Sequence, residues 1–105
     1  MAYNHLDLEL IRNLSLKEPK TLLERFAKLS EECGELATEL LIEMKASGSR
    51  HKKPGEDGIV GEAIDVMLVA ISIYFCAGGS MENLALLAHQ KCNKWQRFQN
   101  KDLTI

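Results

Sequence analysis

Residues Pro19 to Ala46 read PKTLLERFAKLSEECGELATELLIEMKA. Apolar residues recur in this stretch in steps of three and four, the spacing that places side chains along one face of an α-helix. Thr21, with Glu24 three residues later, forms a capping box, which is a start signal for a helix. The stretch therefore predicts one long helix with a single apolar stripe made of Leu22, Phe26, Leu29, Cys33, Leu36, Leu40 and Met44.

Three further helices are predicted, at about Leu6 to Leu14, Gly58 to Ala77 and Met81 to Lys101. Ser15 and Glu18 resemble a second capping box, and Ser80 is a good N-cap for the last helix. The helix from Gly58 is apolar nearly all round, so it should be central. In a chain of 105 residues, this pattern predicts an all-α fold, with a single helical domain over residues 1–105. We expect a four-helix-type bundle that associates with other copies through its helices.

The composition of the chain argues against several classes of protein. Apolar residues make up 46% and aromatic residues 6%, so the core should be aliphatic. The net charge of −2 argues against non-specific nucleic-acid binding. The isolated cysteines Cys33, Cys76 and Cys92 form no metal-binding pair and indicate a reducing, cytoplasmic location. No signal-peptide pattern opens the chain, and the apolar run Ala63–Ala77 is shorter than the roughly 20 residues of a membrane span, so no membrane partner is expected.

Two acid pairs at helical spacing stand out from this background. Glu32 and Glu35 lie on the long helix, and Glu62 and Asp65 follow after a gap of 26 residues. Each pair projects from one helix face, and an antiparallel arrangement of the two helices would let the pairs face each other. Oxygen-only ligands favour magnesium or manganese over zinc or copper. The four carboxylates therefore suggest a divalent cation and a phosphate substrate.

The acids also admit a plainer interpretation. Carboxylates at this spacing are common on solvated helix faces, where they pair with basic neighbours such as Lys28. This alternative applies to Glu31, Glu32, Glu35 and Glu39. It fits Asp65 poorly, because Asp65 is flanked by apolar residues, and a buried carboxylate needs a proton, a partner or a metal.

The segment Glu31-Glu32-Cys33-Gly34-Glu35, followed by Glu62-Ala63-Ile64-Asp65, resembles the signature of the MazG-like all-α nucleoside triphosphate pyrophosphohydrolases. The resemblance covers about Thr21 to Phe98, and the small single-domain form looks like phage-type or compact bacterial members. It implies a magnesium-dependent enzyme that converts a nucleoside triphosphate, often a deoxynucleotide, to the monophosphate and pyrophosphate. It also implies a homodimer or homotetramer.

Carried over residue by residue, the resemblance makes Glu32, Glu35, Glu62 and Asp65 the metal ligands. They would hold two or more Mg²⁺ ions per site, with Mn²⁺ as a substitute. Glu31 and Glu35 would be the catalytic acids, with Glu31 orienting water. Substrate contacts are expected from a cluster late in the last helix and from the basic loop before the third, namely Lys91, Asn93, Lys94, Trp95 and Lys53.

Other interpretations of this accessory cluster and of the whole chain stay open. Lys91 and Lys94 also suit an ordinary cationic helix end, and Trp95 also suits a core position. A purine deoxynucleotide such as dGTP is a weak expectation for the substrate. The chain could instead be a non-catalytic helical dimerisation module, or a nucleotide sensor without turnover.

Overall fold

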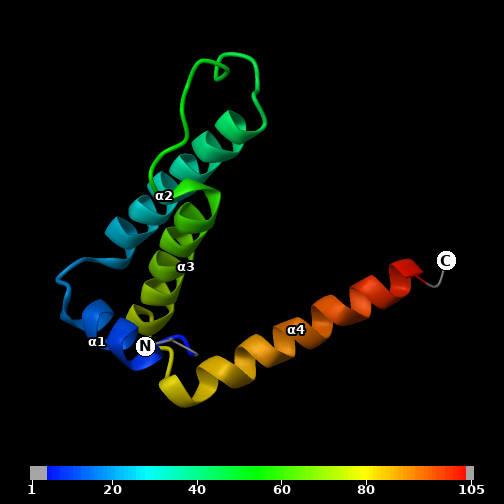
Figure 1. The fold of residues 1–105 in the computed structure, drawn as a ribbon. Helices are drawn as coiled ribbons and strands as arrows, with labels where there is room; N and C mark the ends of the chain where they lie inside the picture. The colour runs from blue at the N-terminus through cyan, green and yellow to red at the C-terminus, as the bar shows by residue number, and fades with distance from the viewer. Residues whose placement is uncertain (1–4, 104–105) are drawn as a thin grey trace.

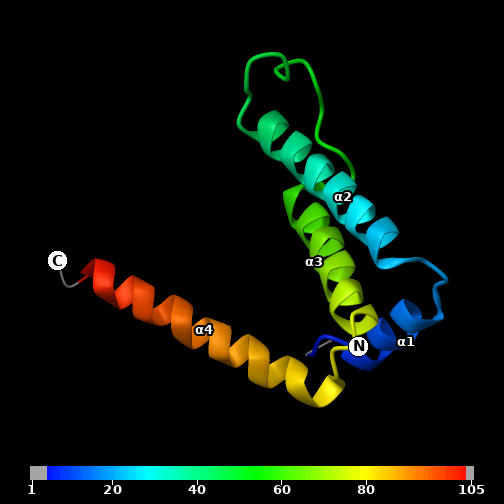
Figure 2. The ribbon, with the colours of Figure 1, turned by 180° about the vertical axis from the view of Figure 1, so that it is seen from behind.

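The computed structural model describes residues 5–103, and within this range all regular structure is helical. The four helices are α1 (Leu8–Lys17), α2 (Leu22–Glu43), α3 (Gly58–Cys76) and α4 (Met81–Leu103). α2 and α3 lie side by side and antiparallel, with α1 across the far end of α3 (Figures 1 and 2). The predicted all-α class is confirmed, and the long-helix and third-helix boundaries are close to those predicted.

The start of α2 follows the predicted capping box. The Thr21 hydroxyl accepts a hydrogen bond from the Glu24 backbone N–H at 3.1 Å, and the Glu24 carboxylate accepts one from the Thr21 N–H at 2.9 Å. These bonds satisfy donors that the first helical turn leaves open. They also lower the pKa of Glu24.

The second predicted capping box, at Ser15 and Glu18, is wrong. Ser15 is buried inside α1, where its hydroxyl donates to the Ile11 carbonyl at 2.6 Å. Glu18 instead ends α1 as its C-cap. The first helix therefore runs three residues past the predicted end at Leu14.

The connection between α1 and α2 is held by one buried cation. Arg25 is only 4% exposed, and its guanidinium donates to the carbonyls of Ser15, Glu18 and Lys20. It also donates to the Ser72 hydroxyl of α3. The Arg25 side chain of α2 therefore links the C-terminal end of α1 to Ser72 on α3.

The row of α2 that faces α3 is charged, and this differs from the expected packing. The buried residues of α2 are Arg25, Glu32, Glu39 and Ile42. The apolar stripe lies about a quarter turn away around the helix and is largely exposed. The apolar periodicity predicted the α2 helix correctly. The face of α2 that is buried, however, is mainly the charged one.

α3 packs against both α2 and α1, consistent with a central position. It is nevertheless little covered, since only 6% of its most apolar 18-residue window is buried. With 19 residues and a mean hydropathy of 2.0, α3 meets the length and composition of a membrane span. The expectation that the run is too short rested on Ala63–Ala77, whereas the helix begins five residues earlier. Core helices of soluble proteins pass the same test, so length and composition alone leave both possibilities.

α4 projects away from the other helices (Figures 1 and 2). The turn before it contains Gly78, with a φ of 103°, and Gly79, where an added Cβ would collide with the Tyr74 ring. The Tyr74 hydroxyl donates to the Ser80 carbonyl at 2.8 Å, and the Ser80 hydroxyl caps α4 by accepting from the Asn83 N–H. A four-helix bundle is therefore not completed within a single chain.

The role of Arg25 can be tested by removing its hydrogen bonds. We expect Arg25→Met to destabilise the fold by about 2–4 kcal/mol, because it leaves buried carbonyls without donors. The control Arg97→Met changes an exposed residue of α4 and should stay within about 0.5 kcal/mol of wild type. Chemical denaturation followed by circular dichroism measures both, and equal stabilities for the two variants would contradict this role.

Candidate metal centre

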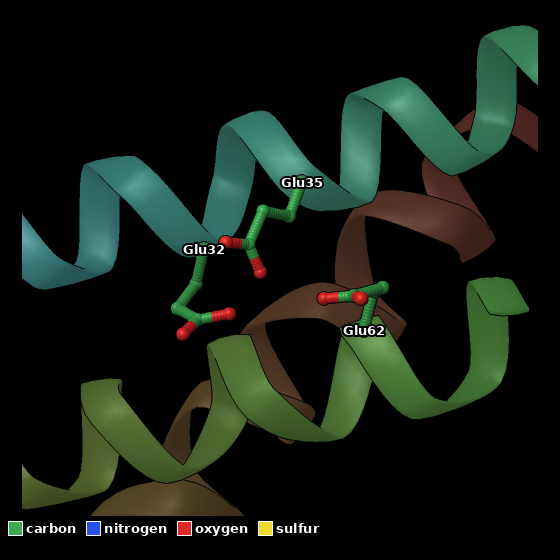
Figure 3. Close-up of side chains that lie close together, drawn as sticks. All are labelled: Glu32, Glu35 and Glu62. Atoms are coloured by element: carbon green, nitrogen blue, oxygen red, sulfur yellow. The ribbon is translucent and has the colours of Figure 1, made fainter. Parts of the chain in front are cut away.

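Three carboxylates meet between α2 and α3. Glu32 and Glu35 come from α2 and Glu62 from α3, and the three side chains point into the space between the helices (Figure 3). One carboxylate oxygen from each lies within 4.8 Å of the others. A cation bound at about 2.0–2.6 Å from each oxygen can be accommodated with modest side-chain adjustment. The predicted meeting of the two acid pairs is thus partly realised.

Two carboxylate oxygens of this group are buried without partners among the described residues. Glu32 is 8% exposed, and its Oε2 atom accepts no hydrogen bond from the described residues. The Oε2 atom of Glu62 is likewise buried and unpaired. An uncompensated buried carboxylate is unfavourable by several kcal/mol. The two open oxygens, on opposite helices, are the positions at which a cation would be most favourable.

The acids also perturb each other. A hydrogen bond with Glu32 and the negative charges of Glu32 and Glu62 raise the pKa of Glu35. Desolvation, followed by the charges of Asp65 and Glu32, raises the pKa of Glu62. Repulsion from neighbouring carboxylates contributes to both shifts, beside the hydrogen bond at Glu35 and the desolvation of Glu62. A divalent cation in this space would reverse both.

Lys28 is the only cation that the described residues bring to this cluster through an ion pair. Its Nζ atom lies 3.1 Å from the Glu32 Oε1 and 3.3 Å from the Glu31 Oε1. These contacts raise the pKa of Lys28. Glu31 is exposed and lies at the rim. Lys28 therefore pairs with the Oε1 atom of Glu32, and the Oε2 atom accepts no hydrogen bond from the described residues.

Asp65 belongs to a second, overlapping group. Asp57, Glu62 and Asp65 bring one carboxylate oxygen each within 4.8 Å of one another. The four predicted ligands therefore do not form one group, since Glu62 is shared between two. Asp57 was missed by the sequence analysis because it lies in the N-cap position of α3, outside the helical pairs. The only sequence signal for it was an acid immediately before the third helix.

Glu39, which the plainer interpretation placed on a solvated face, is buried for a different reason. It is 8% exposed, and its Oε1 atom accepts a hydrogen bond from the Gly55 N–H at 2.8 Å. Glu39 therefore anchors the loop that leads into α3. The solvated-face interpretation is wrong for Glu32 and Glu39, whereas Glu31 and Glu35 are exposed as it expects.

The predicted substrate-binding residues are not brought to the acids within one chain. Lys91, Asn93, Lys94 and Trp95 are exposed on α4, which extends away from the α2–α3 pair (Figure 1). Lys53 is exposed in the loop between α2 and α3. Their roles stay predictions.

The donor set fits a hard divalent cation. All the ligand atoms are carboxylate oxygens, which Mg²⁺, Mn²⁺ and Ca²⁺ prefer. No histidine or cysteine joins either group of acids among the described residues. The unpaired oxygens of Glu32 and Glu62 supply the physical reason for a cation there.

Comparison with protein-family models, with curated proteins and with solved structures finds no match to this chain. Its functional assignment therefore depends on the residues and geometry described above.

The raised pKa values predict how stability depends on pH without metal. The ordinary pKa of both carboxyls is 4.5, and the folded protein raises the values for Glu35 and Glu62. The folded state therefore retains protons that the unfolded chain releases above pH 4.5. The contribution of these two groups to stability should fall as the pH rises through their folded pKa values.

This pH dependence can be measured as the thermal unfolding midpoint in the presence of a chelator, from pH 4.5 to neutral. Glu62→Gln should flatten the decline, and added Mg²⁺ should raise the wild-type midpoint at neutral pH. Glu43→Gln, an exposed neighbour on α2, is the matched control and should keep the wild-type profile. An unchanged profile in Glu62→Gln would contradict the assignment.

Proposed function

We propose that the protein is a magnesium-dependent nucleoside triphosphate pyrophosphohydrolase that acts in the cytoplasm. The observation that carries this proposal is the cluster of Glu32, Glu35 and Glu62 between two antiparallel helices, with two buried oxygens lacking partners. The sequence resemblance adds the reaction, from a (deoxy)nucleoside triphosphate to the monophosphate and pyrophosphate. A purine deoxynucleotide such as dGTP is the first substrate to test.

The arrangement suits chemistry at a phosphate. Bound Mg²⁺ would neutralise phosphate charge and polarise the phosphoryl group that is attacked. Glu32, Glu35 and Glu62 would hold one cation, and Asp57 and Asp65 would join Glu62 in holding a second. Sharing of Glu62 between the two acid groups supports the expectation of two ions per site.

The remaining residues would position substrate and water. Glu31, exposed at the rim beside Lys28, can accept a proton from an attacking water molecule. Lys91, Lys94 and Asn93 would contact phosphate and sugar, and Trp95 would stack on the base. Since α4 points away from the acids of its own chain, we propose that a second copy supplies these residues in a homodimer or homotetramer.

A non-catalytic helical association module is the second candidate. Its support is the apolar stripe of α2, which is exposed in a single chain. This candidate predicts that the acids contribute only charge and that Mg²⁺ leaves the thermal stability unchanged. A nucleotide sensor would bind Mg²⁺ and nucleotide without releasing pyrophosphate.

The test is pyrophosphate release from a panel of nucleoside and deoxynucleoside triphosphates with Mg²⁺ or Mn²⁺. Glu35→Gln and Asp65→Asn should each lower turnover by about 100-fold or more, because each removes a ligand of charge-neutralising metal. Glu43→Gln should retain wild-type turnover.

The outcome separates the candidates. No pyrophosphate from any nucleotide would reject the enzyme, and a Mg²⁺-dependent thermal shift without turnover would favour the sensor. Neither turnover nor a thermal shift would favour the association module. Full activity in Asp65→Asn would mean that the second acid group does not hold metal.

A further inference from the structure

A cavity of about 270 Å³ lies between α1, α2 and α3. Its walls are mainly aliphatic and include Ile11 and Leu14 of α1 and Leu68 and Val69 of α3. The volume is near the lower end of the roughly 300–1,000 Å³ range of small-molecule pockets. The cavity therefore has the size for one planar ring system rather than for a whole nucleoside triphosphate.

Polar groups of both charge signs line the same cavity. Lys20, Arg25 and Lys28 contribute cations, Glu18 contributes a carboxylate, and Ser72 contributes a hydroxyl. The guanidinium of Arg25 is occupied by backbone carbonyls and by the Ser72 oxygen, which leaves the Ser72 hydroxyl proton available to a ligand. The side chains of Lys20 and Lys28 are 44% and 42% exposed, so their ammonium groups can also donate to a ligand.

The Glu18 carboxylate has acceptor capacity left. Its Oε1 atom lies 3.6 Å from the Lys20 Nζ and 3.7 Å from the Arg25 Nη1, and both distances exceed those of direct hydrogen bonds. A carboxylate has about four acceptor positions, so Glu18 can accept from N–H groups of a ligand. The cavity thus presents neighbouring donors and an acceptor at the edge of apolar walls.

Lys28 connects this cavity to the acid cluster. It lines the cavity, and its Nζ atom lies 3.1 Å from the Glu32 Oε1. On α3, Leu68 follows Glu62 by six residues, which is about 9 Å along the helix axis. On α2, Arg25 precedes Glu32 by seven residues, which is about 10 Å. A ring in the cavity would therefore lie from the acids at about the distance that separates base and phosphates in an extended nucleotide.

We infer that this cavity holds the base of the nucleotide and prefers a 6-oxopurine such as guanine. The inference rests on the proposed function, in which the acid cluster holds the phosphates through metal. Guanine has the acceptors O6 and N7, and its amino group is a donor. Lys20 and Lys28 would donate to the acceptors, and Glu18 would accept from N1–H and the amino group.

The same groups would disfavour adenine. Adenine carries an amino donor at the position where guanine carries the O6 acceptor, so it would place a donor against the ammonium groups. Glu18 and Lys20 lie side by side, as do the N1–H and O6 groups of guanine that they would contact. This recognition of the edge of the base adds to the stacking proposed for Trp95.

The ratio of kcat/KM for dGTP to kcat/KM for dATP tests the preference. We expect wild type to favour dGTP and Glu18→Gln to lower the ratio about 10-fold, which is the scale of one base-edge contact. The amide has no charge, and its NH2 group would oppose the N–H groups of guanine. The Mg²⁺ dependence of turnover should stay unchanged, because Glu18 belongs to neither acid group. Glu43→Gln is the matched control and should keep the wild-type ratio.

Filling the cavity provides a second variant. Val69→Phe should raise the KM for dGTP about 10-fold or more, while the Mg²⁺-dependent thermal shift stays as in wild type. Val60→Phe makes the same change on α3 at a residue that is 79% exposed and lies outside the cavity lining, so it should keep the wild-type KM. Circular dichroism checks that both variants fold, and Glu18→Gln alone decides the test if Val69→Phe does not.

A titration with guanosine separates this inference from the proposed function, because it needs neither metal nor turnover. In the presence of a chelator, guanosine should shift the NMR signals of Leu68 and Val69 in the full chain, and adenosine should shift them less. Binding of guanosine without pyrophosphate release from any nucleotide would reject hydrolysis alone and support the guanine-binding cavity.

Three results would overturn the inference while leaving the enzyme in place. They are equal or greater kcat/KM for dATP than for dGTP in wild type, a ratio unchanged in Glu18→Gln, and guanosine shifts that avoid the cavity residues.

Discussion

The structure depends on burying charge between α2 and α3. Three ionisable residues of α2, Arg25, Glu32 and Glu39, are buried along the row that meets α3. The charges of Arg25 and Glu39, at the two ends of this row, are compensated by backbone groups. Backbone carbonyls accept hydrogen bonds from Arg25, and the Gly55 N–H donates one to Glu39. Glu32 in the middle has Lys28 on one oxygen and no partner on the other. The position that lacks a partner is the one that faces Glu62.

The difference between Glu32 and the two compensated residues, Arg25 and Glu39, distinguishes a candidate site from a structural interaction. Arg25 and Glu39 organise the two connections that flank α2, so their burial has a local structural explanation. Among the described residues, the inner oxygens of Glu32 and Glu62 have no such explanation. The hydrogen bond with Glu32 raises the pKa of Glu35, desolvation raises that of Glu62, and neighbouring negative charges add to both. On the proposed function, a divalent cation bound here would compensate these carboxylates.

The sequence predicts the helices well because helical periodicity and capping are local. It does not distinguish Thr21, a true N-cap, from Ser15, because both are followed by glutamate at the third position. The difference lies in Arg25, which binds the Ser15 carbonyl from ten residues away. That Glu32 and Glu62 face each other was predictable from the spacing of the acids along each helix and from the antiparallel arrangement of α2 and α3. The contribution of Asp57 was not predictable, because Asp57 lies before α3 rather than at a helical spacing within it. The orientation of α2 was not predictable either, because its charged row rather than its apolar stripe is buried among the described residues.

The acids at the start of α3 bear on whether this helix could lie in a membrane. An apolar helix with two acids in its first turns is unfavourable inside a bilayer unless those acids are paired. Glu62 and Asp65 lie in groups with other acids, so burial in lipid would add a desolvation cost to the repulsion between carboxylates.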